Sequence, residues 1–143
     1  MNRIAVAQLT SEAFAPFGDV GTPHADDGHA AGDVALDLSR GTPRCVSRIA
    51  ASSSRSWRGT IGSRDGEPWL MAVMPANFVQ PGLADIRSFC ISPECFIKLG
   101  LGTRHAGPYF TEPVSDFYNL PMVDTNIADY TVWPPDAPLE FAT

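Results

Sequence analysis

The chain has 143 residues, of which 44% are hydrophobic, and this size and composition predict one globular domain spanning 1–143. Its formal net charge of −6 favours neither nucleic acid nor an anionic membrane surface as a partner. Three cysteines make no disulfide framework, the N-terminus has no apolar signal segment, and no run reaches the roughly 20 apolar residues of a membrane span, so we expect a cytoplasmic protein.

The first expected element is a short helical turn near the N-terminus. Thr10 can cap this turn, and Pro16 limits it because the residue before a proline avoids the helical region. Phe14 and Phe17 lie three residues apart and are expected to anchor the turn to the core.

The next stretch, residues 22–34, is rich in Gly, Ala, Asp and His and predicts a loop. It contains four side chains of metal-ligand type, namely His24, Asp26, Asp27 and His29. A solvated loop does not preorganise a metal site, so we expect no metal there.

From residue 45 onward the sequence predicts short strands. The apolar run 69–74 lies between Pro68 and Pro75 and predicts a strand buried on both faces. A helical turn is expected at 82–86, and the other expected strands are 45–50, 87–91, 96–99, 114–120 and 130–133. No segment keeps a helical period beyond ten residues, so we predict an all-β fold of the cupin type, a double-stranded β-helix or jelly-roll barrel with one or two short helical turns.

Several segments, in the right order, resemble the ureidoglycolate lyase family, whose members are cupins. They are 9–20 (LTSEAFAPFGDV), 66–70 (GEPWL), 81–89 (PGLADIRSF), 102–105 (GTRH) and 114–117 (VSDF). The resemblance covers roughly residues 9–133. It implies a carbon–nitrogen lyase of allantoin and purine catabolism that cleaves ureidoglycolate to glyoxylate and urea, and it implies a homodimer.

The chain also departs from the family pattern. The family motif G-x-W-H-H is Gly102-Thr103-Arg104-His105-Ala106 here, and an upstream tyrosine–histidine pair is Leu99-Gly100. Two alternatives therefore stay open beside the lyase: a diverged cupin enzyme acting on another small carboxylate, and a non-catalytic module that binds one. Many cupins hold a divalent ion through a histidine- and glutamate-containing pattern that this sequence lacks, so we expect no metal and no cofactor.

The lyase chemistry selects four candidate site residues. His105 is the catalytic candidate, because histidine transfers protons near neutral pH. Arg104 and Lys98 are substrate-binding candidates because a cation is needed for the substrate carboxylate. Asp116, in the family-like segment 114–117, is the third substrate-binding candidate. Lys98 shares one strand face with Gly100, and the apolar residues Ile97 and Leu99 share the other. Strand alternation alone does not decide which of these two faces points into the barrel. For Arg87 we expect a structural role at the end of its helical turn.

Overall fold

The computed structural model describes residues 2–23, 47–50, 60–77, 82–120 and 137–142. Within these ranges the chain forms ten strands and two short helical turns. The turns are α1 (Ser11–Phe14) and the 3-10 turn η1 (Leu83–Asp85). The strands are β1 (Asn2–Gln8), β2 (Gly18–Gly21), β3 (Ser47–Ala50), β4 (Thr60–Ser63), β5 (Trp69–Met74), β6 (Arg87–Ile91), β7 (Phe96–Leu99), β8 (Arg104–Tyr109), β9 (Val114–Leu120) and β10 (Leu139–Ala142).

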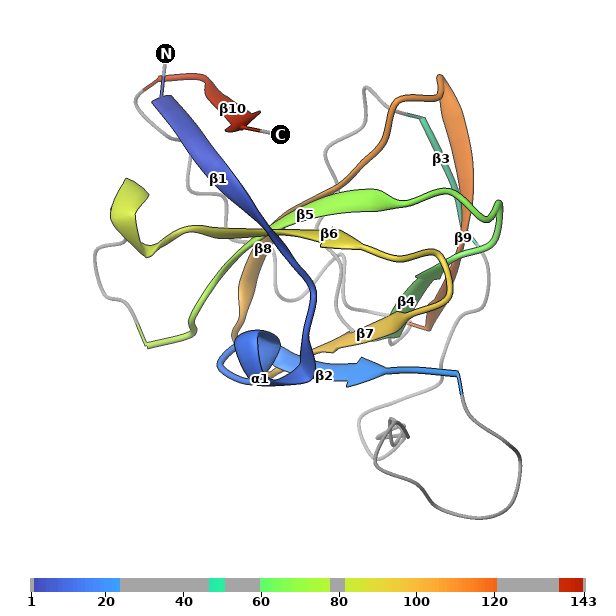
Figure 1. Ribbon diagram of the computed structural model, residues 1–143, viewed down its shortest axis with the longest axis horizontal. Coiled ribbons are helices and arrows are strands. Elements are labelled where there is room, and N and C mark those ends of the chain that lie inside the picture. The colour runs from blue at the N-terminus through green and yellow to red at the C-terminus, as the bar shows by residue number, and fades with distance from the viewer. Residues whose placement is uncertain (1, 24–46, 51–59, 78–81, 121–136, 143) are drawn as a thin grey trace.

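The strands make two five-stranded sheets. The first has the order β10-β1-β6-β5-β8 and the second the order β2-β7-β4-β9-β3. All pairs in the second sheet are antiparallel, whereas β1 runs parallel to both β10 and β6 in the first. β1 and β10 lie side by side at one side of the molecule, and β3 and β9 lie at the other (Figure 1).

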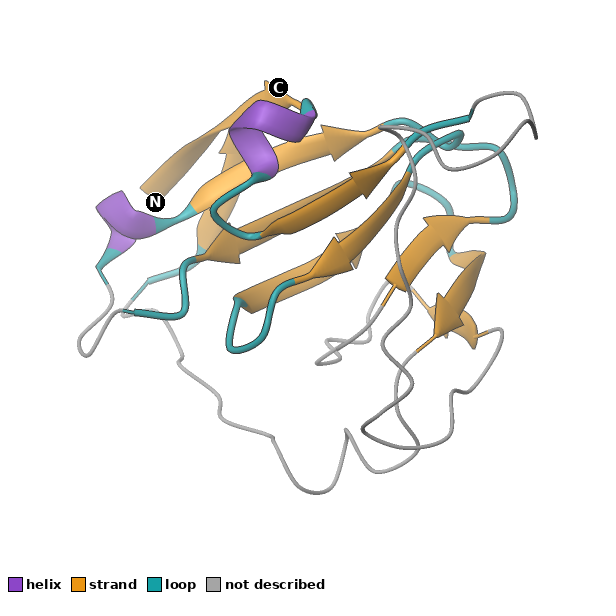
Figure 2. Ribbon diagram, turned by 90° about the horizontal axis from the view of Figure 1, so that it is seen from below, coloured by secondary structure: helices purple, strands orange, loops and turns teal. Residues whose placement is uncertain are grey.

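Both sheets are curled, and together they form a half-barrel with the helical turns outside it (Figure 2). The fold is therefore all-β and of the jelly-roll type, as the sequence predicted. The expected strands at 87–91, 96–99 and 114–120 are present with those bounds, and 47–50 of the strand expected at 45–50 is present. The strand expected at 130–133 lies outside the described residues.

The core lies between the sheets and is rich in aromatic rings. On β5, Trp69, Met71 and Val73 alternate into this core, while Leu70 and Ala72 on the other face are only half-buried. Met74, also on that other face, is buried, so the prediction that this strand is buried on both faces is correct in full for one face and in part for the other. The second sheet supplies Ile61, Ile97, Leu99 and Phe117 from the opposite side.

The N-terminal turn is anchored as the sequence predicted. The Thr10 hydroxyl accepts a hydrogen bond from the Ala13 amide at 3.1 Å and so caps α1. Phe14 and Phe17 are both buried, and each ring packs against Phe89 of β6, at centroid distances of 5.4 and 5.9 Å. These contacts fix the turn against the core.

The helices of the described residues are a few residues long, and none is long and apolar enough to cross a membrane.

Candidate functional site

His105 lies on the inner face of the first sheet. In an antiparallel pair, residues directly opposite each other project to the same face. His105 of β8 is opposite Val73 of β5, which is 1% exposed and part of the core. Arg104 is opposite Met74 and therefore projects to the other face. The structure places these two neighbours in the motif on opposite sides of their sheet.

Lys98 lies on the outer face of the second sheet. Its neighbours Ile97 and Leu99 are both in the core, so strand alternation turns Lys98 away from it. Opposite Lys98 in the register are Asp19 of β2 and Thr60 of β4. Ile97 and Leu99, and not Lys98, therefore face the interior of the barrel. Lys98 points outward, whereas His105 points inward.

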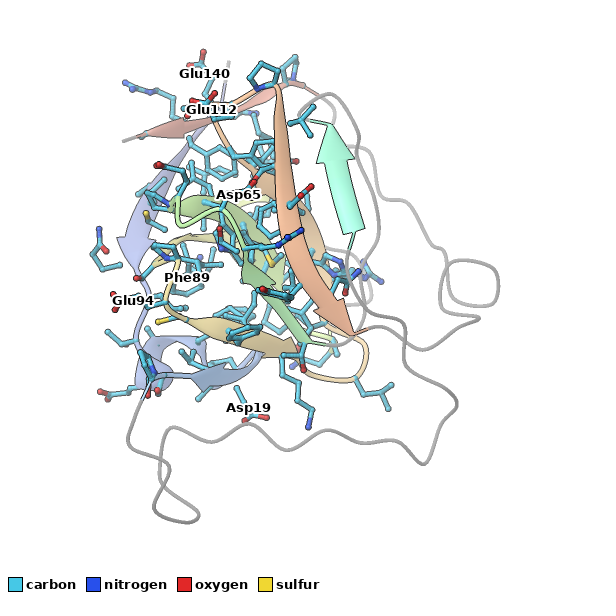
Figure 3. All side chains as sticks on the ribbon, turned by 90° about the vertical axis from the view of Figure 1, so that its right-hand side faces the viewer. Asp19, Asp65, Phe89, Glu94, Glu112 and Glu140 are labelled. Atoms are coloured by element: carbon cyan, nitrogen blue, oxygen red, sulfur yellow. The ribbon has the colours of Figure 1, made fainter. Side chains whose placement is uncertain are left out.

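Asp116 also projects outward, because Ser115 and Phe117 on either side of it are buried. An Arg64 nitrogen, Nη1, lies 3.4 Å from Asp116 Oδ2. The Asp65 carboxylate accepts hydrogen bonds from the Asp116 amide at 2.6 Å and from the Ser115 hydroxyl at 3.0 Å. Asp65 lies in the β4–β5 connection next to β9 (Figure 3), so this group ties the connection to the second sheet.

Arg87 is a cation on the same face as His105. It is opposite Val73 on the β6 side, so Arg87, Val73 and His105 form a row across three strands. Arg87 Nη1 donates to the carbonyl oxygens of Ala84 at 2.7 Å and Ile86 at 3.1 Å, which confirms its expected structural role beside η1. The residue is exposed, so its guanidinium group lies at the margin of the inner face.

Three inward polar groups were not found from the sequence. Ser63, Trp69 and Asn119 are 8%, 1% and 3% exposed. Among the described residues, their Oγ, Nε1 and Oδ1 atoms are the buried side-chain atoms without a hydrogen-bond partner. Each residue type is ordinary in a strand, and the missing partner is a property of tertiary packing that no motif or spacing signals.

The described residues contain no group of three His, Cys, Asp or Glu side chains that could hold a metal ion. The four ligand-type residues of the 22–34 stretch lie outside them. Cys90 and Cys95 are half-buried free thiols. Burial, and secondarily the Glu94 carboxylate, raises the pKa of Cys95, and burial raises the pKa of Tyr109. Neither group is thereby activated as a nucleophile or base at neutral pH.

No protein-family model matches the chain, and no curated protein matches it. The resemblance to ureidoglycolate lyases therefore stays a prediction from the sequence segments. The candidate site is the inner face of the half-barrel, where His105 lies.

Proposed function

We propose that this protein is a lyase that cleaves ureidoglycolate to glyoxylate and urea, with His105 as the proton-transfer group. The observation that supports this most is the inward position of His105, opposite the core residue Val73, in an all-β jelly-roll fold. A histidine there is half-buried and sits beside apolar residues, where a small polar substrate can be kept from bulk water.

The chemistry needs one proton to move twice. Ureidoglycolate has a carbon that bears both a hydroxyl group and a urea nitrogen. His105 accepts the hydroxyl proton, the carbon–oxygen double bond forms, and the carbon–nitrogen bond breaks. The same imidazolium then donates its proton to the departing nitrogen, which leaves as urea. Atoms and charge balance without a cofactor, and one histidine suffices as base and then acid.

The substrate carboxylate needs a cation near His105. Arg87 is in the same cross-strand row as His105, and its planar guanidinium can bind two carboxylate oxygens. Arg104 and Lys98 project to the outer faces of their sheets, so of these three cations Arg87 fits this role best. The sequence-based assignment of Arg104 and Lys98 to substrate binding remains the competing prediction.

The test is glyoxylate release from ureidoglycolate by the purified chain. His105→Ala is expected to lower kcat by roughly one hundredfold or more, the usual scale for losing a general acid or base. Arg87→Ala is expected to raise KM at nearly constant kcat, and Arg104→Ala is its matched control, an outward arginine with little expected effect. Wild-type protein that releases no glyoxylate, or unchanged kinetics in His105→Ala, would reject the proposal.

A second candidate is a diverged cupin that acts on or only binds another small carboxylate. It is favoured by Gly100 and Ala106, which stand where the family has histidines. A thermal-shift panel of 2-oxo, 2-hydroxy and ureido acids separates the two, because a bound ligand raises Tm whether or not it is turned over. A strong shift with a non-ureido acid and no glyoxylate release would favour this candidate.

The resemblance further implies a homodimer that acts in allantoin catabolism, and we propose this assembly, together with the cytoplasmic location expected from the sequence, alongside the activity. Light scattering at micromolar concentration is expected to give twice the 15.4 kDa mass of one chain. A monomeric mass would reject the dimer and leave the activity to be judged by its own assay.

A further inference from the structure

The three residues that carry the unpartnered polar atoms are all neighbours of Phe117. Ser63 is directly opposite Phe117 in the β4–β9 pair. The Trp69 ring meets Phe117 edge-on across the core, with centroids 5.4 Å apart and planes at 84°. Asn119 is the next inward residue after Phe117 on β9. We call Ser63, Trp69, Phe117 and Asn119 the Phe117 cluster, and it joins polar atoms from both sheets.

Burying these atoms without partners costs free energy. A buried polar group that loses its water without gaining a hydrogen bond destabilises the folded state, and native proteins therefore leave few such atoms. Three of them, on neighbours of Phe117 in three strands, make up the whole set found among the described residues. Such a concentration is expected where the missing partner is a bound molecule.

The three groups define the chemistry of that molecule. The indole Nε1 of Trp69 can only donate, the Oδ1 of Asn119 can only accept, and the hydroxyl of Ser63 can do either. None is charged. A carboxylate or phosphate would meet the lone pairs of Asn119 Oδ1 without a compensating cation in the cluster. An amide or urea group instead has a carbonyl oxygen for Trp69 and an N–H for Asn119.

The register also relates the cluster to His105. Two strands leave the β4–β5 connection, and every second residue of each faces the core. Counted from the connection, these inward residues are Ser63 and Ile61 on β4, and Trp69, Met71 and Val73 on β5. Asn119 is opposite Ile61, the second of these positions, and His105 is opposite Val73, the third. On β5 itself, Val73 is four residues from Trp69, or roughly 13 Å of strand, so the cluster and His105 lie at different depths of the inner face.

We infer that the Phe117 cluster is a subsite for an uncharged amide or urea-type group. That this group belongs to a ureido acid rests on the proposed function. Recognition of the group itself does not, because it follows from the donors and acceptors of the cluster.

The test follows the Trp69 indole N–H by NMR while methylurea is added at non-denaturing concentrations. The chain has three tryptophans, and Trp69→Phe assigns the resonance. In wild-type protein methylurea is expected to shift the Trp69 signal saturably, whereas acetate, a carboxylate without an N–H, is expected to leave it in place. This readout does not need the catalytic assay. The lyase proposal and the subsite can therefore be rejected independently of each other.

Two variants make the test specific. Asn119→Leu keeps the branched shape of the side chain and removes the acceptor, so methylurea binding is expected to weaken about five- to tenfold, the scale of one hydrogen bond. Ser63→Ala removes one hydroxyl and is expected to weaken binding by a smaller factor, which keeps the test available if the leucine variant does not fold. An unmoved Trp69 signal, as ordered water alone would give, overturns the inference. Equal binding by wild type and the folded variants overturns it as well.

Discussion

Among single residues, Asp65 has a clear structural role that can be measured. Its carboxylate accepts two hydrogen bonds from β9, one from the Asp116 amide and one from the Ser115 hydroxyl. Asp65→Ala is expected to lower the free energy of unfolding by roughly 1–3 kcal/mol, because both donors lose a charged acceptor and Ser115 is buried. Glu67→Ala, an exposed acid in the same connection, is the matched control. Equal stability of the two variants in urea unfolding would contradict this role.

The Cys95 thiol gives a second residue-level prediction, which concerns pH. Burial and the Glu94 carboxylate both raise its pKa, so the folded protein favours the neutral thiol. At neutral pH the reactive thiolate is therefore scarcer than in an unfolded chain, and alkylation by iodoacetamide should be slow and should rise at higher pH than for a free thiol. Glu94→Gln removes the smaller cause and should speed the reaction modestly. Mass spectrometry of the Cys95 peptide measures this, and faster labelling in the native than in the denatured chain would refute it.

Only some residues of the candidate site could be predicted from the sequence. The segment 102–105 identified His105, whose inward face the structure then established. The same segment suggested Arg104 as a companion, yet adjacent strand residues project to opposite faces. Ser63, Trp69 and Asn119 could not be selected from the sequence, because their shared feature arises only when β4, β5 and β9 pack around Phe117.

Among the elements, the β2–β7 pair depends on a glycine. A Cβ added at Gly18 would overlap the carbonyl oxygen of Lys98 on the neighbouring strand. Gly18→Ala is therefore expected to force β2 away from β7 and to destabilise the protein by at least about 2 kcal/mol. Gly82→Ala is the control, since its Cβ would lie at an ordinary 3.5 Å from Asp85 Oδ2. Thermal unfolding of the two variants should differ clearly, and matching Tm values would disprove the close approach.

Two of the strands that the sequence missed, β4 and β8, have a weak apolar signal. β4 is Thr60-Ile61-Gly62-Ser63, with a single large apolar residue, yet all four positions are buried. Its central Gly62 is covered by the ring of Phe96, which would lie 2.7 Å from an added Cβ. β8 contains Gly107-Pro108, which local propensity assigns to a turn. By contrast β5 and β6 are dominated by large apolar or aromatic residues, and their burial could be anticipated.

For the whole molecule, the parallel pairing of β1 with β10 links the two ends of the described chain. Asn2 to Ala5 are opposite Leu139 to Ala142, and beyond them Val6 to Gln8 pair with β6. β1 thus uses both of its edges, although most of its side chains are exposed. The Phe141 ring of β10 also packs against Tyr109 of β8, with centroids 5.1 Å apart. β10 therefore pairs with the edge of β1 and also contacts β8, a distant strand of the same sheet.

Removal of residues 137–143 should test this closure of the sheet. The truncated chain loses the β1–β10 hydrogen bonds and the Tyr109–Phe141 contact, so we expect the free energy of unfolding to fall by about 2 kcal/mol. It also leaves the backbone groups of β1 unpaired, and an unprotected edge strand recruits other chains. Light scattering of the truncated protein should therefore rise with concentration above that of the full chain. Phe141→Ala separates the two effects, because it removes the ring and keeps the backbone pairing; it should lower stability without promoting association. A truncated protein as stable and as monodisperse as the full chain would show that β10 is dispensable.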